Sequence, residues 1–384
     1  MPASRQAATA QRFAPAGCGE RPDLLVVGVG PAGASAAAAA AAAGCRVLAL
    51  DRRHSLGEPV QCAEFVSDAC GIAGLSWDEV TTQRIVRMVS TVEGREPRVS
   101  EDFRGRMICR RTFDRALARL ATAAGARILT GVAVCGIEAT GVRLSNGRLI
   151  RPRALLGADG PRSVVGAALG RSNQHWVAAR QVTVRLARPD DATEIFLRAA
   201  FTGGYAWLFP KGDTANLGLG VDFQHRGRLK SLLQDLQAGL AAAGRVSARP
   251  LSLTGGLIPV GARRRAVGRL GAVAVLLAGD AAGLTNPVTG AGIEAAVHSG
   301  MLAGRAVASW LDGSPGALAE YESELSDLYD PAQARALRHR SALRAADERG
   351  GATAEQLWRG WIASPEYWSE CLPAGSPRPG PVRA

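Results

Sequence analysis

The sequence is almost devoid of lysine. Of its 46 basic residues only Lys211 and Lys230 are lysines, and 34 acidic residues leave a formal net charge of +12. Nucleic-acid binding ordinarily uses basic residues interleaved with aromatic ones, and this sequence lacks that pattern. The charge therefore argues only weakly for RNA, while anionic lipid headgroups and nucleotide phosphates stay open as partners.

Motifs for metal binding and for hydrolysis are also missing. The 7 cysteines contain no C-x-x-C pair and the 5 histidines no H-E-x-x-H motif, so we expect no metal site. Neither a G-x-S-x-G elbow nor a P-loop is present, which leaves those hydrolase and NTPase classes without support. An odd number of cysteines without paired spacing favours a protein of the reducing cytosol.

Long apolar segments are lacking as well. Residues 1–20 contain no stretch long enough for a signal-peptide core, and no later run approaches a membrane span free of charge. With 384 residues and 47% hydrophobic composition, the chain can bury a large core in two intertwined domains. We expect a cytoplasmic protein that would meet a membrane only from its inner face.

The N-terminal part has the pattern of a dinucleotide-binding unit. An apolar run at 23–27 leads into the turn Gly28-Val29-Gly30-Pro31-Ala32-Gly33, eight alanines follow at 36–43, and a second apolar run at 45–50 ends at Asp51. This order predicts strand, tight turn, helix and strand. Glycines at 28 and 30 would let backbone N–H groups approach a pyrophosphate, Gly33 would allow close helix–strand contact, and Asp51 would accept from ribose hydroxyls.

Two later strands end in an acid and a glycine, at Asp159-Gly160 and at Gly279-Asp280. Between them, residues 177–260 show the alternation of a mainly antiparallel sheet. A helix is predicted at 112–124, with two more at 317–328 and 332–346. The fold class is therefore α/β: a Rossmann-type domain interrupted by an antiparallel sheet and followed by a helical C-terminal segment.

These patches together resemble the FAD-dependent oxidoreductases of the p-hydroxybenzoate-hydroxylase-like superfamily, over about residues 22–310. Within it, Tyr205-Ala206-Trp207-Leu208-Phe209-Pro210-Lys211-Gly212 is similar to the YxWxFPKG motif of the geranylgeranyl reductase family. Cys62-Ala63-Glu64 is similar to the archaeal-type lipid reductases and differs from the Lys-Pro-Cys-Gly-Gly form of the chlorophyll branch. The resemblance disfavours that branch and leaves the isoprenoid open.

The resemblance implies a division of the chain into domains. The FAD-binding domain would comprise 22–80, 107–172 and 266–312, and the substrate domain 81–106 and 173–265. A helical segment would occupy 313–372, between flexible tails at 1–21 and 373–384.

FAD is the cofactor that the resemblance implies. An acid at 280 would hold the ribityl hydroxyls, and small residues from Pro287 to Gly292 would let the backbone approach the flavin ring, with the positive end of a following helix directed at it. Arg111 matches a family position near FAD, although a surface arginine is an equal alternative. The expected FAD contacts are Gly28, Gly30, Pro31, Ala32, Gly33, Asp51, Arg52, Arg111, Ala133, Asp159, Gly279, Asp280, Pro287, Gly290, Gly292 and Ile293.

Reduction of an isolated alkene requires a proton donor beside the hydride donor. By resemblance Cys62 is the candidate, with Glu64 and Tyr205 as partners or alternatives; outside the motif, a buried thiol is ordinarily a small core hydrophobe. Tyr205, Trp207 and Phe209 alternate along a predicted strand, so their rings share one face that could line a path for an alkyl chain. Ordinary sheet core is the competing interpretation, weakest for Trp207, whose indole N–H needs a partner.

The electron donor is not readable, because no second G-x-G-x-x-G is present. NADPH, NADH or a reduced carrier protein would bind transiently. Arg263-Arg264-Arg265 could meet a phosphate, but a solvated basic loop is the favoured interpretation.

The C-terminal segment combines Trp358, Trp361, Tyr367 and Trp368 with Arg335, Arg338, Arg340 and Arg344. That composition suits a peripheral membrane surface with basic and aromatic contacts, although a cap over the FAD domain is the commoner outcome.

The expected function is FAD-dependent reduction of carbon–carbon double bonds in an isoprenoid lipid. The alternative on the same fold is a monooxygenase of an aromatic or lipid substrate, and an RNA-binding flavoprotein is less favoured. The oligomeric state is not indicated.

Overall fold

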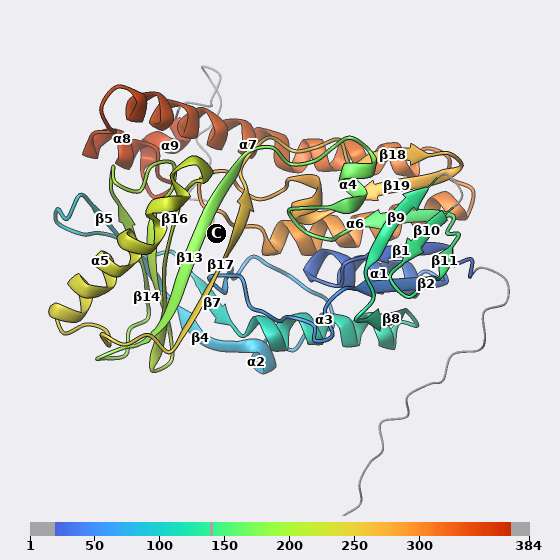
Figure 1. The fold of residues 1–384 in the computed structure, drawn as a ribbon, viewed down its shortest axis with the longest axis horizontal. Coiled ribbons are helices and arrows are strands. Elements are labelled where there is room, and N and C mark those ends of the chain that lie inside the picture. Colours follow the sequence, from blue (N-terminus) through green and yellow to red (C-terminus); the bar gives the residue numbers. More distant parts are fainter. Residues whose placement is uncertain (1–19, 139–140, 370–384) are drawn as a thin grey trace, which may run out of the picture.

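The computed structural model of this chain describes residues 20–138 and 141–369. Figure 1 shows two lobes, one built on a parallel sheet and one on a larger antiparallel sheet, with a long helix running across both. The tails expected at 1–21 and 373–384 lie almost wholly outside the described residues.

A six-stranded sheet forms the centre of the first lobe. Its strands are β1 (Leu24–Val27), β2 (Val47–Asp51), β8 (Arg127–Thr130), β12 (Ala154–Gly157), β18 (Val267–Leu270) and β19 (Val273–Leu277). They lie in the order β18-β19-β12-β1-β2-β8, and all neighbours are parallel except the edge pair of β18 and β19. The central strands are buried along their whole length, which is why they contain almost only Leu, Val and Ala.

Helix α1 (Pro31–Ala42) packs between α3 (Arg110–Ala123) and α6 (Ile293–Leu311). Its alanine run lets α6 approach at backbone distance. A methyl group added at Gly300 would lie 2.0 Å from the Ala32 carbonyl oxygen, and one at Gly304 would lie 2.4 Å from that of Ala36. Small residues on both helices therefore fix the position of α1, and with it the turn that precedes the helix.

Seven strands form the sheet of the second lobe: β5 (Arg87–Val92), β6 (Arg98–Ser100), β13 (Trp176–Arg185), β14 (Ala192–Leu197), β15 (Ala206–Lys211), β16 (Thr214–Asp222) and β17 (Ser252–Pro259). Their order is β17-β13-β16-β15-β14-β5-β6, with only β5 and β14 parallel. The predicted mainly antiparallel sheet is confirmed. Helix α5 (Leu229–Ala242) covers one face through Leu229, Leu233, Leu236 and Leu240.

Two small sheets and four short helical segments connect these parts of the described structure. The sheets comprise β3 (Phe65–Ser67), β4 (Thr81–Ile85) and β7 (Gly105–Ile108), and β9 (Val134–Glu138), β10 (Gly141–Leu144) and β11 (Leu149–Ile150). The short helices are α2 (Trp77–Val80), α4 (Val164–Ala168), η1 (Phe223–Arg228) and η2 (Gly279–Ala282).

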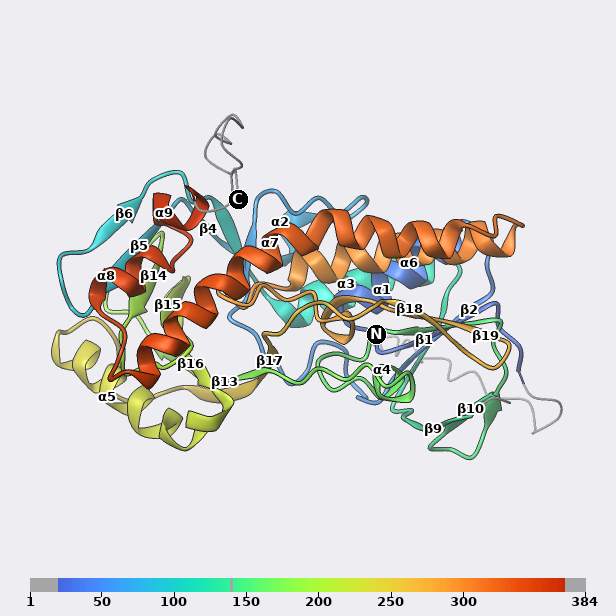
Figure 2. The same ribbon diagram turned by 90° about the horizontal axis from the view of Figure 1, so that it is seen from above.

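One long helix, α7 (Ala317–Glu348), replaces the two helices predicted on either side of Pro331. A proline inside a helix removes one hydrogen bond and crowds the preceding turn, at a cost of about 3 kcal/mol. Tyr321 and Leu325 are buried before it and Ala336 after it. Because both flanks are anchored, tertiary packing outweighs the local cost, and Figure 2 shows the helix passing from one lobe to the other.

The C-terminal segment caps the second lobe, through α8 (Ala354–Arg359) and α9 (Pro365–Ser369). The predicted cap over the FAD domain is confirmed only for α7, which packs on α6 and β18; α7 then carries the chain across the molecule, and α8 packs on β5 and β14. The prediction of aromatic membrane anchors is wrong for Trp361 and Tyr367, which are only 3% and 2% exposed. No helix in the described part of the chain is long and apolar enough to span a membrane.

Candidate functional site

The turn between β1 and α1 has the geometry of a phosphate-binding turn. Gly28 has φ +93°, and a methyl group there would lie 2.4 Å from the Ala158 carbonyl oxygen; at Gly33 it would lie 1.8 Å from that of Gly28. A methyl group at Gly30, by contrast, would meet nothing within 4 Å. Two glycines are thus demanded by the packing, and the third leaves open space before the positive end of α1, where Pro31 and Ala32 begin the helix. This open cradle fits a pyrophosphate.

Asp51 lies at the end of β2 beside this turn. Its Oδ2 accepts from the Val29 N–H at 3.0 Å and its Oδ1 from the Arg53 N–H at 2.8 Å, so the carboxylate is held in place with acceptor capacity left over. The Val132 N–H donates to the Asp51 carbonyl oxygen at 3.0 Å, which brings neighbouring Ala133 to the same edge. Arg52 is exposed.

The two later acid–glycine elements converge on the same turn. A methyl group at Gly28 would lie 2.7 Å from Asp159 Cα, and one at Gly279 would lie 3.2 Å from Ala32 Cβ. The Asp159 carboxylate, however, accepts from the Ser163 hydroxyl at 2.5 Å and the Val164 N–H at 2.7 Å. It therefore holds the start of α4, while burial raises the pKa of this carboxyl group despite those donors.

Asp280 is the half-buried acid that faces the loop before α6. Its Oδ1 accepts from the Thr285 hydroxyl at 2.9 Å and lies 3.3 Å from a methyl group placed on Gly292. Burial raises the pKa of Asp280, while the Thr285 hydroxyl and the charge of Arg110 act in the opposite direction. A carboxylate in this position has a desolvation cost that ligand hydroxyl groups can offset.

The loop from Pro287 to Gly292 is preorganised by its own hydrogen bonds. Asn286 Oδ1 accepts from the N–H groups of Val288 and Thr289 at 2.9 and 3.1 Å, and Gly290 has φ +70°. The helix predicted to follow this loop starts at Ile293, with Gly292 as its N-cap. Its first turn, with unpaired N–H groups, adjoins Asp280.

Cys62 and Glu64 lie on a loop that Glu64 holds in a strained backbone conformation, with φ +69°. The Glu64 N–H donates to Cys62 Sγ at 3.2 Å. The Glu64 carboxylate accepts from the Arg110 N–H at 2.9 Å, from Lys211 Nζ at 2.5 Å and from Asn216 Nδ2 at 3.1 Å. With its side chain 5% exposed and three donors bound, Glu64 fixes the loop that carries the thiol.

Arg110, which the sequence reasoning missed, lies beside the Cys62 loop, where its backbone N–H donates to Glu64. Its guanidinium pairs with Asp114 at 3.0 Å, and its charge acts to lower the pKa of Asp280. Arg111 is instead 55% exposed and pairs with Glu58 at 2.6 Å. The signal was available: Arg110 lies three residues before Phe113, on the buried face of α3, and Arg111 does not.

The rings of Tyr205, Trp207 and Phe209 share one face, as predicted, with centroids 5.8 and 6.4 Å apart. The Trp207 N–H donates to Gln181 Oε1 at 3.0 Å, and Gln181 Nε2 donates to the Cys62 carbonyl oxygen at 3.2 Å. The indole thus has the partner it needs, and this partner links the aromatic face to the thiol loop.

Tyr205 joins that face to the loop before α6. Its hydroxyl donates to the Thr289 carbonyl oxygen at 2.5 Å, and burial raises the pKa of the phenol. Trp361 from the C-terminal cap packs 4.9 Å from the Tyr205 ring, and its buried indole N–H has no partner in the described structure. Sequence reasoning did not place Trp361 here, because its position depends on the path of α7.

Arg263 contradicts the prediction of a solvated basic loop. Its side chain is 9% exposed and pairs with Glu322 at 2.5 Å and Asp330 at 2.8 Å, both on α7. Both carboxylates come from α7, which is distant in sequence, so the residues around Arg263 did not indicate them. Among the described residues, no group of three His, Cys, Asp or Glu side chains could hold a metal ion.

Comparison with known proteins agrees with this geometry. A model of the geranylgeranyl reductase catalytic domain matches residues 175–257. A digeranylgeranylglycerophospholipid reductase of Methanopyrus kandleri is 34% identical over 76% of this chain and 78% of its own length, and one of Methanocella arvoryzae is 31% identical over 79% and 83%. The chain belongs to the geranylgeranyl reductase family. Like its family, it is an FAD-dependent oxidoreductase.

Solved structures show the same fold. A geranylgeranyl bacteriochlorophyll reductase-like protein of Thermoplasma acidophilum superposes with a TM-score of 0.78 and 24% identity, covering 91% of this chain and 98% of that one. A probable FAD-dependent monooxygenase of Pseudomonas aeruginosa gives 0.67 and 20% identity over 86% and 98%. The α/β fold class with its two sheets is confirmed.

Proposed function

We propose that this member of the geranylgeranyl reductase family reduces carbon–carbon double bonds of a geranylgeranyl-type isoprenoid lipid. The observation that supports it best is the meeting of three segments at one place: the Cys62 loop, the Tyr205 strand, and the loop from Pro287 to Gly292. Three hydrogen bonds join them: Trp207 donates to Gln181, Gln181 donates to the Cys62 carbonyl oxygen, and Tyr205 donates to the Thr289 carbonyl oxygen. The digeranylgeranylglycerophospholipid reductases named above support the substrate class.

FAD would be held by the open cradle at Gly30, by the carboxylates of Asp51 and Asp280, and by the loop before α6. When bound, the flavin supplies the hydride for the alkene. The other expected contacts extend this proposed site, except that the exposed Arg111 gives its place to Arg110. Asp159 would act indirectly, by holding α4 beside the turn.

Cys62 is the proposed proton donor to the second alkene carbon. The Glu64 N–H donates to its sulfur at 3.2 Å and so orients the thiol. Glu64 is then a positioning residue, because its carboxylate is already bound by three donors. Tyr205 stays protonated at neutral pH and orients the loop through Thr289.

The alkyl chain would lie against the face formed by Tyr205, Trp207 and Phe209, beneath the C-terminal cap. The electron donor is proposed to be NAD(P)H or a reduced carrier protein that binds transiently. We retain the domain boundaries at 22–80, 107–172 and 266–312 for FAD, and 81–106 and 173–265 for the substrate.

Product mass tests this function against its rival, a monooxygenase on the same fold. The FAD-loaded protein, reduced with dithionite without oxygen, should add two hydrogens per double bond to a digeranylgeranyl glycerophospholipid. An oxygen-dependent gain of one oxygen atom, without hydrogenation, would support the monooxygenase instead. Unchanged lipid under both conditions would reject this substrate class.

A further inference from the structure

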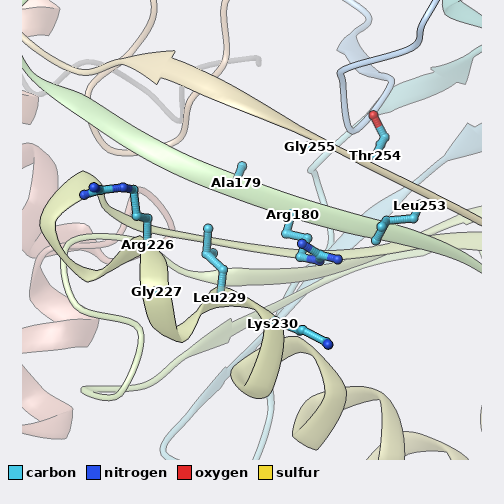
Figure 3. Close-up of a pocket in the computed structure, with 9 residues that line it drawn as sticks. All are labelled: Ala179, Arg180, Arg226, Gly227, Leu229, Lys230, Leu253, Thr254 and Gly255. Atoms are coloured by element: carbon cyan, nitrogen blue, oxygen red, sulfur yellow. The ribbon is translucent and has the colours of Figure 1, made fainter.

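A basic pocket lies away from the proposed site, where β13 and β17 meet the junction of η1 and α5. Its volume is about 450 Å³, and it is lined by Ala179, Arg180, Arg226, Gly227, Leu229, Lys230, Leu253, Thr254 and Gly255. Figure 3 shows Arg180 beneath β13 on the side of α5, with Lys230 at the start of that helix. The lining contains three cations and no carboxylate.

These cations have no internal counter-charge. Arg180 and Lys230 form no hydrogen bond or ion pair with any described residue, and Arg226 donates only to the Phe223 carbonyl oxygen at 3.0 Å. Arg87 and Arg245, which lie elsewhere on the same sheet lobe, each pair with an acid. Leu229 and Lys230 also begin a 14-residue helix, whose positive end adds to the field in the pocket.

Large apolar side chains face solvent in the pocket lining and in the segments that continue from it. Leu251 is 52% exposed, Leu253 57% and Phe223 36%, and Arg226 lies 4.2 Å above the Phe223 ring. Along β17, Leu251, Leu253 and Gly255 point to one side of the sheet. Gly255 stands opposite Arg180, and a methyl group there would lie 2.6 Å from the Ala179 carbonyl oxygen, so no side chain fits at this position. Cations within an apolar rim are the chemistry of a membrane interface.

The pocket is connected to the thiol loop. Thr254 Oγ1 donates to the Val60 carbonyl oxygen at 2.6 Å, and Gln61 Nε2 donates to that of Gly255 at 2.8 Å. Strand β17 therefore has the pocket on one side and the residues just before Cys62 on the other.

We propose that this pocket binds the phosphate headgroup of a membrane glycerophospholipid, with Leu251, Leu253 and Phe223 entering the lipid surface around it. Arg180, Arg226 and Lys230 contact the phosphate. The inference rests on the proposed function, in which the substrate is itself such a lipid, and it moves the membrane contact from the C-terminal aromatic segment to the η1–β17 corner.

Vesicle binding by the FAD-loaded full chain tests the proposal without turnover. At low salt the protein should sediment with phosphatidylcholine vesicles that contain phosphatidylglycerol, and much less with phosphatidylcholine alone. The variant R180Q/R226Q/K230Q should bind the anionic vesicles on the order of a hundredfold more weakly, since each cation near such a surface contributes about fivefold. The variant L251S/L253S should also weaken binding, although its charge is unchanged.

The control variant R95Q/R269Q/R305Q removes the same charge at three exposed positions elsewhere. Its affinity for the anionic vesicles should fall by less than about threefold, because charges farther than a Debye length from the lipid surface act on it only weakly. Equal losses in both triple variants would overturn the pocket, as would failure of the unaltered protein to bind anionic vesicles at any ionic strength. If inorganic phosphate displaced the protein from the vesicles as effectively as added anionic vesicles do, the pocket would be a site for free anions. That result would overturn the membrane assignment.

FAD absorbance and the thermal midpoint confirm that each variant is folded. Vesicle binding is measured without any reaction product. The protein could bind vesicles without reducing a lipid, or reduce a lipid without binding vesicles, so failure of one proposal is distinguishable from failure of the other.

Discussion

At the scale of single residues, the site is organised around Cys62 by groups far away in sequence. Glu64 turns the backbone so that its own N–H meets the sulfur, and Lys211 holds the Glu64 carboxylate from the end of β15. Removing one member of such a buried pair costs about 3–5 kcal/mol, because the other charge is left unpaired. The lysine of the YxWxFPKG motif, Lys211, therefore serves as the counter-charge of Glu64.

Replacing Cys62 by serine should lower alkene reduction by about a hundred- to ten-thousand-fold, because a hydroxyl is a far weaker proton donor than a thiol. FAD content and photoreduction of the flavin should be unchanged. Single-turnover oxidation of the reduced enzyme by lipid substrate measures the step. The control is Cys135→Ser, at an exposed cysteine of β9. Full activity in the Cys62 variant would assign the proton to another group.

Replacing Asp280 by asparagine should separate stability from cofactor binding. Burial raises the pKa of Asp280 in the folded state. Its protonated form favours folding, so the contribution is complete below the unfolded pKa of about 3.9 and is lost as pH rises through the folded value. The asparagine variant avoids this loss. In the FAD-free state its advantage in unfolding free energy should grow from pH 4 to pH 8.

The same variant should bind FAD about 10- to 100-fold more weakly, because a hydrogen bond to a charged acceptor becomes one to a neutral acceptor. Urea denaturation across that pH range and FAD titration by fluorescence measure the two effects. Asp78→Asn, on short helix α2 at the surface, is the control for both. Tighter FAD binding in the Asp280 variant would remove this carboxylate from the cofactor site.

At the scale of elements, packing between helices α1 and α6 determines where the nucleotide turn lies. The glycines of α6 lie against the backbone of the alanine run in α1. No larger side chain fits between the two helices at these positions. A shift of α1 by one side chain's width would displace the turn at Gly30 from the acids at 51 and 280.

Substituting alanine for Gly300 should therefore destabilise the protein by about 1–3 kcal/mol, because the new methyl group would lie 2.0 Å from the Ala32 carbonyl oxygen. The matched control is Gly239→Ala in α5, where nothing lies within 4 Å and where loss of backbone freedom should stabilise by about 0.4–1 kcal/mol. Chemical denaturation measures both. Equal effects of the two substitutions would contradict close packing of α1 and α6.

Elements with strong local signals could be predicted from sequence, and those decided by distant packing could not. The turn at Gly28, the acids after β12 and β19, and the shared ring face of Tyr205 and Trp207 all follow from glycine placement and from alternation. The two helices predicted on either side of Pro331 are one helix, because packing on both sides outweighs the local cost of the proline. Arg110 was missed because the position of Arg111 in a motif was weighed above the buried face of the helix.

At the scale of the whole molecule, Arg340 joins the helix α7 to both lobes. Its guanidinium pairs with Asp222 at the end of β16, and donates to the Gly203 carbonyl oxygen at 2.6 Å and to that of Pro287 at 3.3 Å. Pro287 belongs to the loop proposed to lie against the flavin. One buried side chain thus connects the antiparallel sheet, the bridging helix and the cofactor loop.

Exchange of Arg340 for methionine should cost about 3–5 kcal/mol, since Asp222 loses its buried partner. We expect one calorimetric unfolding transition for the unaltered protein and two for this variant, because the lobes lose a shared contact. The exchange Arg305→Met, at an exposed position of α6, should leave one transition near its original midpoint. A single transition of unchanged midpoint in the Arg340 variant would show that the lobes are held together elsewhere.

The scarcity of lysine gives the molecule an experimental property of its own. Lys211 is enclosed by its partner Glu64, while Lys230 stands in the open at the edge of the basic pocket. Apart from the terminal amine, amine-directed chemistry is therefore steered to one side chain. A single fluorophore attached there by reductive alkylation, which keeps the positive charge of the amine, would sit where the protein is proposed to touch a bilayer, and its emission would report docking without any mutation.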